Sequence, residues 1–166
     1  MAISNVVKVR RDGTIAIADN SGFGGANVLT VNYENGDFSY EHSKADRIVI
    51  RDRGVIAGLR QADDPVPTLT FTVHAREFTN GTAVTLIDVV MRTGGAAAWT
   101  SSGPTGYEQF LVDCRLTVEG TDFTDSADGT AVFADVLLTY SYAEGDPNTI
   151  SVSGEVYGAI TRTGQA

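Results

Sequence analysis

Few residues in this sequence have side chains that commonly carry out chemistry. The two histidines, His42 and His74, both fall within alternating strand patterns, and the one cysteine, Cys114, shares a strand face with Val112 and Leu116. A thiol on an apolar face behaves as a small hydrophobic side chain and is a poor nucleophile. We therefore expect all three to be ordinary strand residues without a catalytic or metal-binding role.

Two loops resemble binding motifs only superficially. The glycine-rich GFGGAN at 22–27 precedes an expected strand, whereas glycines that bind phosphate precede a helix. In DFTDSADG at 122–129 the aspartates recur every third residue, so they lack the ligand order of a calcium loop. Basic and aromatic residues do not interleave as they do on nucleic-acid-binding surfaces. The sequence therefore predicts no enzyme, no cofactor and no metal site.

Alternation of apolar and polar residues is the dominant pattern in the chain. Such alternation is typical of antiparallel strands with one face buried. It predicts strands at 14–18, 29–34, 38–42, 47–50, 68–76, 110–119, 132–142 and 150–156. The dipeptide Asn35-Gly36 favours a tight hairpin between the second and third of these strands.

One segment has helical spacing instead. Apolar residues at 83, 86, 87, 90 and 91 predict a helix over about 82–92, capped by Asn80 or Thr82 and ended by Gly94-Gly95. A flexible loop around Trp99 is expected to follow, over 94–106. The expected fold is mainly β, an antiparallel sandwich or barrel with this one flanking helix. It forms a single domain over 1–166, with its core at about 14–157 and tails that are flexible or become ordered on assembly.

The segment 43–67 has an unusual composition. It has no sustained helical or strand period after residue 50, and Pro65 and Pro67 end it. We expect a long loop that is mobile in the free subunit and buried on assembly. Apolar and charged side chains are interspersed in it, and both kinds are candidates for an interface. The candidate interface residues are Arg47, Arg51, Arg53, Val55, Ile56, Leu59, Arg60, Asp63 and Asp64.

The charge of the chain is unevenly distributed. The formal net charge is −9, and residues 104–166 hold 10 acidic and 2 basic side chains, while five of the 12 basic residues lie in 44–60. A basic loop and an acidic half suit recognition of another copy of the chain. No apolar run approaches the ~20 residues of a membrane helix. The N-terminal residues lack the order of a signal peptide, and one cysteine forms no internal disulfide, so we expect synthesis in the cytoplasm.

The organisation of residues 14–157 resembles that of the tail tube proteins, or major tail proteins, of tailed bacteriophages. Secretion-system tube proteins share their fold. The matching features are the early hairpin, the long loop at 43–67 entering TLTFTVHARE, the helix GTAVTLIDVVMRTG and the strands YEQFLVDCRLTVEG and AVFADVLLTYSYAEGDPNTISVSGEVYG. No short motif is diagnostic of the family.

This resemblance implies a structural protein of the virion tail. Members of the family form hexameric rings that stack head to tail into a hollow tube, and DNA passes through the tube without specific binding. The implied partners are further copies of the chain and other tail proteins, such as the tape measure, baseplate or terminator, with no membrane. The loop at 43–67 would reach a neighbouring subunit or the next ring. A polar face with Asp113, Glu119 and Asp135 is a candidate for an acidic lumen wall or partner surface.

Two alternatives remain open from the residues themselves. The chain could be another β-sandwich component of a virion, such as a connector or a fibre module. It could also be a barrel that binds a small ligand in a pocket around Trp99 and Tyr107.

Overall fold

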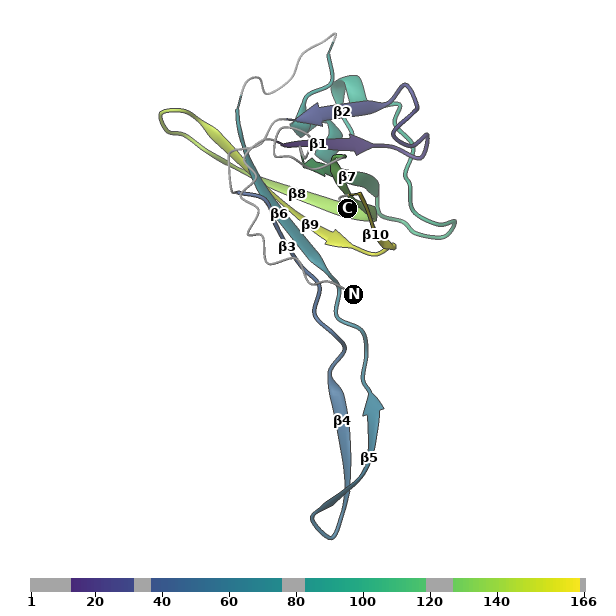
Figure 1. Cartoon of the computed structure of the whole chain (residues 1–166). Helices are drawn as coiled ribbons and strands as arrows, with labels where there is room; N and C mark the ends of the chain where they lie inside the picture. The colour runs from purple at the N-terminus through teal and green to yellow at the C-terminus, as the bar shows by residue number, and fades with distance from the viewer. Residues whose placement is uncertain (1–12, 32–36, 76–82, 119–126, 165–166) are drawn as a thin grey trace.

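The computed structural model describes residues 13–31, 37–75, 83–118 and 127–164 (Figure 1). The described chain is mainly β, with antiparallel pairing throughout and one short α-helix, and its sheet does not close into a barrel. The expected mainly-β sandwich class is thus confirmed. The elements in chain order are β1 Gly13–Ala18, β2 Val28–Val31, β3 Ser39–Glu41, β4 Arg47–Asp52, β5 Val55–Gln61, β6 Thr68–His74, α1 Leu86–Met91, the 3-10 turn Gly94–Ala96, β7 Val112–Val118, β8 Gly129–Ala143, β9 Thr149–Val156 and β10 Ile160–Thr163.

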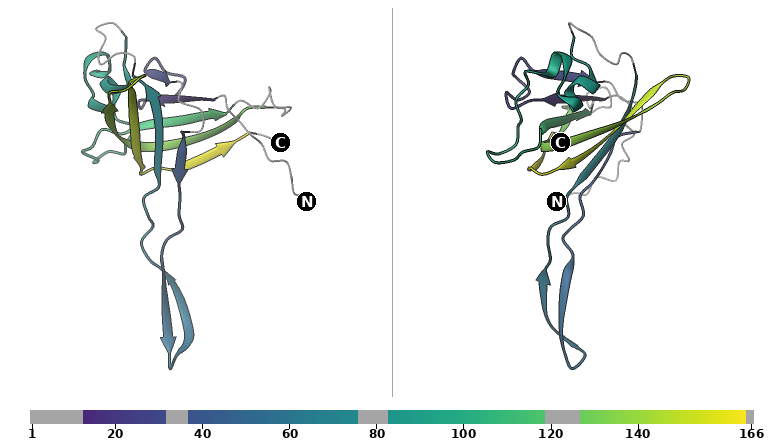
Figure 2. Two further views of the ribbon diagram at one scale, coloured as in Figure 1. Left: turned by 90° about the vertical axis from the view of Figure 1, so that its left-hand side faces the viewer. Right: turned by 180° about the vertical axis from the view of Figure 1, so that it is seen from behind.

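Eight strands form one sheet in the order β2-β1-β7-β8-β9-β6-β3, with β10 also paired to β8. The two ends of this sheet turn toward one another and enclose the core (Figures 1 and 2). The long strand β8 belongs to both halves. It pairs with β7 from Gly129 to Val136 and with β9 from Val136 to Ala143. β10 extends the body beyond the core boundary expected at residue 157.

The core follows the alternation seen in the sequence. Buried side chains alternate with exposed or half-buried ones along β6 and β9 and with half-buried ones along β7. The apolar face of α1 covers one end of the core with Leu86 and Val89. Phe38, which precedes β3, lies 6.5 Å from Phe71 and 6.0 Å from Phe133 between ring centroids. The apolar strand faces therefore hold the two halves of the sheet together.

The two strands that the hairpin expected at Asn35-Gly36 would join, β2 and β3, do not pair with each other within the described residues. β2 pairs with β1, and β3 pairs with β6 at the other end of the sheet. The dipeptide itself lies outside the described residues. Phe38 and β3 pack against strands that are distant in the sequence, and this packing stabilises the fold more than the local turn preference does. A turn preference contributes little stability unless the two strands beside it also pair.

The helix is shorter than the sequence pattern predicts. It begins after Thr85, whose side chain accepts from the backbone N–H of Asp88 (3.2 Å), while the Asp88 carboxylate accepts from the N–H of Thr85 (3.2 Å). This reciprocal capping box fixes the start of the helix at Leu86, about four residues later than expected. Asn80 and Thr82, the caps that the sequence suggested, lie outside the described residues. Arg92, in the left-handed region at φ 52°, ends the helix.

In the loop after the helix, which the sequence predicts to be flexible, the side chains of Ala96 and Trp99 are buried. Trp99 is only 2% exposed and lies in the core with Ala96. The Arg92 Nε–H donates to the Trp99 carbonyl (3.1 Å), and the backbone N–H of Thr100 donates to the buried carboxylate of Asp19 (3.1 Å). Burying a large aromatic side chain in the core stabilises the fold by more than the conformational entropy that the glycine-rich loop loses when it is ordered.

Candidate assembly interface

Residues 47–61 form a two-stranded hairpin, which we call the arm, and it projects away from the body (Figures 1 and 2). β4 and β5 pair from Arg47↔Gln61 to Asp52↔Val55. Arg53 and Gly54 join them with φ values of 49° and 87°. Positive φ at both central residues is the geometry of the type I′ turns that suit the twist of a hairpin. β4 contains the strand expected at 47–50, whereas residues 51–61, which we expected to be an irregular loop, complete a paired ribbon.

The strand β5 was missed for a physical reason. Ala57 is an extra residue opposite the step between Ile50 and Arg51, so it forms a β-bulge that interrupts alternation. Aliphatic side chains also occur on both faces of the ribbon, which hides the two-residue period. The turn dipeptide Arg-Gly is not among the sequences that usually signal a hairpin.

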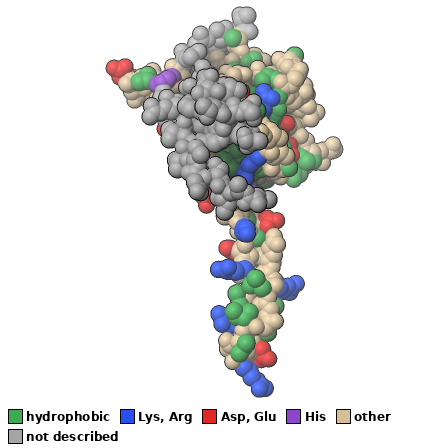
Figure 3. Space-filling model, viewed as in Figure 1, with side chains coloured by type: hydrophobic (Ala, Val, Ile, Leu, Met, Phe, Trp, Pro, Cys, Tyr) green, Lys and Arg blue, Asp and Glu red, His purple; other side chains and the backbone are tan. Residues whose placement is uncertain are grey.

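The arm exposes an unusual amount of apolar surface. Its six large aliphatic side chains range from 37% exposed at Val49 to 70% at Val55; the others are Ile48, Ile50, Ile56 and Leu59. Burying such side chains fully contributes about 1.5–3 kcal/mol each. An isolated two-stranded hairpin is only marginally stable in water. The arm is therefore a surface suited to being covered by another molecule (Figure 3).

The arm and its root bring together all nine of the interface residues that the sequence suggested. Arg47, Arg51, Arg53 and Arg60 line the ribbon, as do Val55, Ile56 and Leu59. Asp63 and Asp64 follow β5 at the root, where the Gln61 side chain donates to Asp64 Oδ1 (2.7 Å). All nine are exposed. Their role in assembly stays a prediction.

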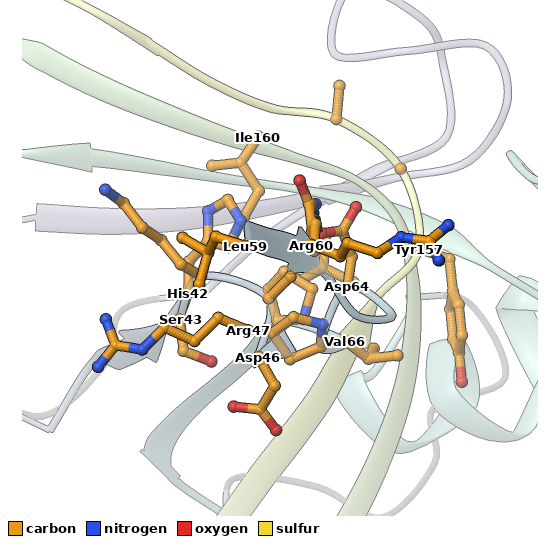
Figure 4. Close-up of a pocket in the computed structure, with 18 residues that line it drawn as sticks. His42, Ser43, Asp46, Arg47, Leu59, Arg60, Asp64, Val66, Tyr157 and Ile160 are labelled. Atoms are coloured by element: carbon orange, nitrogen blue, oxygen red, sulfur yellow. Dashed lines mark hydrogen bonds between the residues drawn. The ribbon is translucent and has the colours of Figure 1, made fainter. Parts of the chain in front are cut away.

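A hollow of about 920 Å³ lies where the arm joins the body (Figure 4). Leu59 and Val66 line it from the arm and its return, and Val156 and Ile160 line it from the end of β9 and from β10. Charged groups of both signs surround these apolar side chains, among them Arg47, Arg60 and Asp64. This mixture is typical of an interface rim rather than a catalytic centre.

The second group suggested by the sequence, Asp113, Glu119 and Asp135, does not form an open acidic face in the described structure. Asp113 and Asp135 are half-buried and meet at the bulge of β8, while Glu119 lies outside the described residues. Burial raises the pKa of Asp113, and the nearby charge of Asp135 adds to this. Their assignment to a lumen wall stays a prediction.

A different surface is open and polar, and besides hydroxyl side chains it carries the exposed carboxylates of Glu41 and Glu155, which the register places on either side of Thr68. The outer face of β3, β6, β9 and the second half of β8 carries two rows of hydroxyl side chains, which the register aligns as Ser39–Thr70–Ser153–Thr139 and Thr72–Ser151–Ser141. We call these seven residues the hydroxyl face. Ser39 Oγ and Thr70 Oγ1 lie 2.8 Å apart, and Thr139 Oγ1 donates to the Ser153 carbonyl (3.2 Å). The sequence showed each strand's polar side but not that these sides align.

The residues with potential chemistry are placed as expected. Cys114 is buried, and burial raises the pKa of its thiol, so it is held as a neutral core side chain. His42 and His74 are exposed strand-end residues.

Within the described ranges, no three His, Cys, Asp or Glu side chains group as metal ligands would. In the same ranges no helix is long and apolar enough to cross a membrane. The barrel alternative is wrong, because Trp99 lies in the core and the sheet does not close.

No protein-family model matches the sequence, and no curated protein is similar to it. Several solved structures nevertheless share its fold. One is a chain of the cryo-EM structure of the anti-feeding prophage baseplate, with a TM-score of 0.59 and 9% identity over 98% of both chains. Another belongs to the PVC sheath/tube terminator of an extracellular contractile injection system, with a TM-score of 0.56 and 11% identity over 98% of this chain and 100% of that one.

A third belongs to the PVC sheath–tube complex in the extended state, with a TM-score of 0.56 and 10% identity over 97% of this chain and 93% of that one. At such low identity, these similarities establish the fold. Chains of a baseplate, a sheath/tube terminator and a sheath–tube complex thus share the fold of this chain, which agrees with the resemblance inferred from the sequence at the level of the fold. A specific identity as a major tail tube protein belongs to the proposal below.

Proposed function

We propose that this protein is a structural subunit of a phage-tail-like particle, and that it forms hexameric rings stacked head to tail into a hollow tube. The observation that carries this proposal is the fold shared, over nearly the full length of both chains, with components of a baseplate, a tube terminator and a sheath–tube complex. In this proposal the chain is made in the host cytoplasm and acts in the tail of the particle. It works without catalysis, a cofactor or a membrane.

Ring formation is supported by two free edges on one half of the sheet. β3 is an edge strand, and all three of its residues are exposed. The pairing of β8 with β7 ends at Val136, and among the described strands none pairs with that edge of β8 from Leu137 to Ser141. Unpaired edges readily add a strand from another chain. Pairing of β3 in one copy with β8 in the next is a head-to-tail contact, and such contacts form a ring when the rotation from copy to copy closes.

The hydroxyl face is the best candidate for the wall of the channel. Its outer surface holds no Lys or Arg from Ser39 to Glu41, Thr68 to His74, Leu137 to Ala143 or Thr149 to Glu155. Contacts of Lys and Arg with phosphate are the main source of nonspecific affinity for DNA. A wall of short hydroxyl side chains would hold water and let DNA slide, as the sequence resemblance suggests. This assignment replaces Asp113 and Asp135 as our preferred wall.

Electron microscopy of the purified protein tests the proposal directly. We expect hollow tubes or stacked rings with sixfold symmetry by negative staining, and a sedimentation coefficient that rises with concentration. A species that stays monomeric over a wide range of concentration and salt would contradict the proposal. Discrete trimers would favour the fibre-module alternative.

One second candidate has a specific observation behind it. Two of the similar structures are a baseplate and a sheath/tube terminator, neither of which is named as a sheath–tube complex. The chain could thus form one end ring that contacts other tail proteins. Single rings that never stack would support that candidate over a repeating tube.

A further inference from the structure

The edge strand β3 is held in the sheet by few contacts. It has three residues, all of them exposed, and among the described strands it pairs only with β6. A strand this short forms few ladder hydrogen bonds, and its register can slip unless inward-facing side chains specify it. The position of β3 therefore depends on its side-chain contacts.

Tyr40 is the inward-facing side chain of β3. Ser39 and Glu41 flank it on the outer face, where Ser39 Oγ lies 2.8 Å from Thr70 Oγ1. Because neighbours along a strand point to opposite faces, Tyr40 points toward the core, and its ring lies 5.2 Å from that of Phe133 between centroids. The Tyr40 side chain is still 37% exposed, so the core alone does not enclose it.

The C-terminal strand covers the Tyr40 ring as well. The guanidinium carbon of Arg162, on β10, lies 5.3 Å from the centroid of that ring. β10 pairs with β8 as Ile160↔Phe133, so Arg162, two residues further along, shares the face of β10 that carries Ile160. β3 and β10 are not paired in the sheet. The cation–π contact thus joins two strands that share no backbone ladder.

This contact exists in only one register of β3. A slip of one residue would turn Tyr40 to the outer face, and a slip of two would bring Phe38 or His42 opposite Leu69 in its place. Either slip would remove Tyr40 from Arg162 and Phe133. The contact with Arg162 therefore stabilises the observed register relative to its neighbours.

The register of β3 decides what its free edge offers to another chain. Only alternate residues of an edge strand turn their N–H and C=O groups outward, so a slip of one residue changes which groups are free. β3 ends at Glu41 and the arm begins at Arg47, so the same register also sets where the arm leaves the body.

We propose that Arg162 is a positioning residue that acts through Tyr40. It fixes the register of β3 on β6, and it thereby presents the free edge of β3 for pairing with a second copy of this chain. The C-terminal strand contributes to assembly in this way without being the strand that pairs. This inference rests on the proposed function and names a residue that controls one contact within it.

The free subunit tests the local step. Arg162→Ala removes the guanidinium group, Arg162→Lys keeps a cation that can lie over the ring, and Tyr40→Leu removes the ring. Arg115→Ala is the matched control, because the Arg115 guanidinium carbon lies 4.5 Å from the Phe23 ring centroid and belongs to β7. Hydrogen exchange followed by NMR reports the protection of the β3 amides, and circular dichroism with a thermal melt reports folding.

We expect Arg162→Ala to stay folded and its β3 amides to exchange about two- to fivefold faster, the factor that corresponds to an exposed cation–π contact. The amides of β7 and β9 should keep their wild-type rates, which separates a local role from a general loss of stability. Arg162→Lys should restore most of the protection, and the control should match the wild type at β3.

A double-variant cycle assigns the effect to the pair. In the Tyr40→Leu background, Arg162→Ala should change β3 exchange little further, because the partner is already absent. Wild-type exchange of β3 in Arg162→Ala, or full additivity of the two substitutions, would overturn the proposal.

Assembly of the full chain gives the second readout. By sedimentation velocity, Arg162→Ala should need at least about twofold more protein to assemble, because a smaller fraction of subunits presents the competent edge. Arg162→Lys should assemble nearly as the wild type does. Faster β3 exchange with unchanged assembly would overturn the positioning role. A wild-type chain that never assembles, but whose β3 exchange responds as expected, would instead contradict the proposed function.

Discussion

The backbone N–H of Asp135 donates a hydrogen bond to the Asp113 carboxylate, with 3.1 Å between N and Oδ1. Asp135 lies in the left-handed region at φ 54°, at a bulge where Ala134 and Asp135 of β8 lie opposite the single residue Asp113 of β7. The bulge leaves that N–H without a partner in the ladder, and Asp113 supplies one. The contact therefore stabilises β8 at the point where it passes from one half of the sheet to the other.

Replacing Asp113 with Ala should destabilise the body. It leaves the half-buried N–H of Asp135 without its acceptor, which costs about 1–3 kcal/mol. Asp113→Asn keeps a carbonyl oxygen at the site and should lose less. Urea unfolding measures both. Equal stability of Asp113→Ala and the wild type would show that water replaces the contact at no cost.

Asp19 should make stability sensitive to acid. Burial opposes ionisation of this carboxyl, but hydrogen bonds from Ser21, Asn27 and Thr100 outweigh burial and lower its pKa. A lowered folded-state pKa contributes stability above the ordinary value of about 3.9. That contribution is lost as the pH falls from about 5 toward 2. Asp19→Asn should lose stability at neutral pH and show a flatter dependence over that window in thermal melts. If the stability of Asp19→Asn depended on pH as that of the wild type does, other carboxylates would be responsible for the sensitivity to acid.

Gly154 occupies a place in the core where no side chain fits. An added Cβ would lie 2.7 Å from Val136 Cγ1, 3.0 Å from Leu138 Cδ2 and 3.1 Å from Leu69 Cδ1. Overpacking of this kind costs about 1–3 kcal/mol, so Gly154→Ala should lower the melting temperature. Gly24→Ala is the matched control, because nothing lies within 4 Å of the Cβ it adds. Similar melting temperatures for both variants would contradict the packing described for β9.

Charge reversal on the arm should block assembly without unfolding the subunit. Arg51, Arg53 and Arg60 lie on the arm, away from the core, so changing all three to Glu should leave the circular dichroism spectrum and thermal melt close to wild type. A single surface ion pair contributes only about 0–1 kcal/mol, but a ring repeats each contact in every subunit. The triple Lys variant, which keeps the charges, is the control. Normal tubes from the folded Glu variant would show that these charges are merely solvated.

The hydroxyl face should become enclosed on assembly. Ser151→Cys places a reactive thiol on that face, and the buried Cys114 should stay unreactive. In the free subunit the new thiol should react with small and polymer-linked maleimides alike. In tubes it should still react with a small maleimide but be protected from a polymer-linked one several kilodaltons in size, as measured by mass shift. Equal labelling by both reagents in tubes would place this face on the outside.

The features of the fold that depend on local periodicity were predicted correctly from the sequence. Alternation along 68–74 and 112–118 was enough to predict strands and their buried sides, including the inert position of Cys114. It also showed that 43–67 could not be part of the core, and the structure places that segment on the arm and its root. These inferences succeed because the side-chain direction in a strand depends only on position along the strand.

Only the tertiary structure decided which strands pair and which loops are buried. β2 and β3 are neighbours in sequence and lie at opposite ends of the sheet, whereas Trp99 fills the core although glycines and polar residues flank it. The alignment of Ser39, Thr70, Ser153 and Thr139 in one row likewise joins residues more than a hundred positions apart. Local pattern determines that an apolar face must be buried. The partner that buries it is selected by packing summed over the whole chain, which no short segment contains.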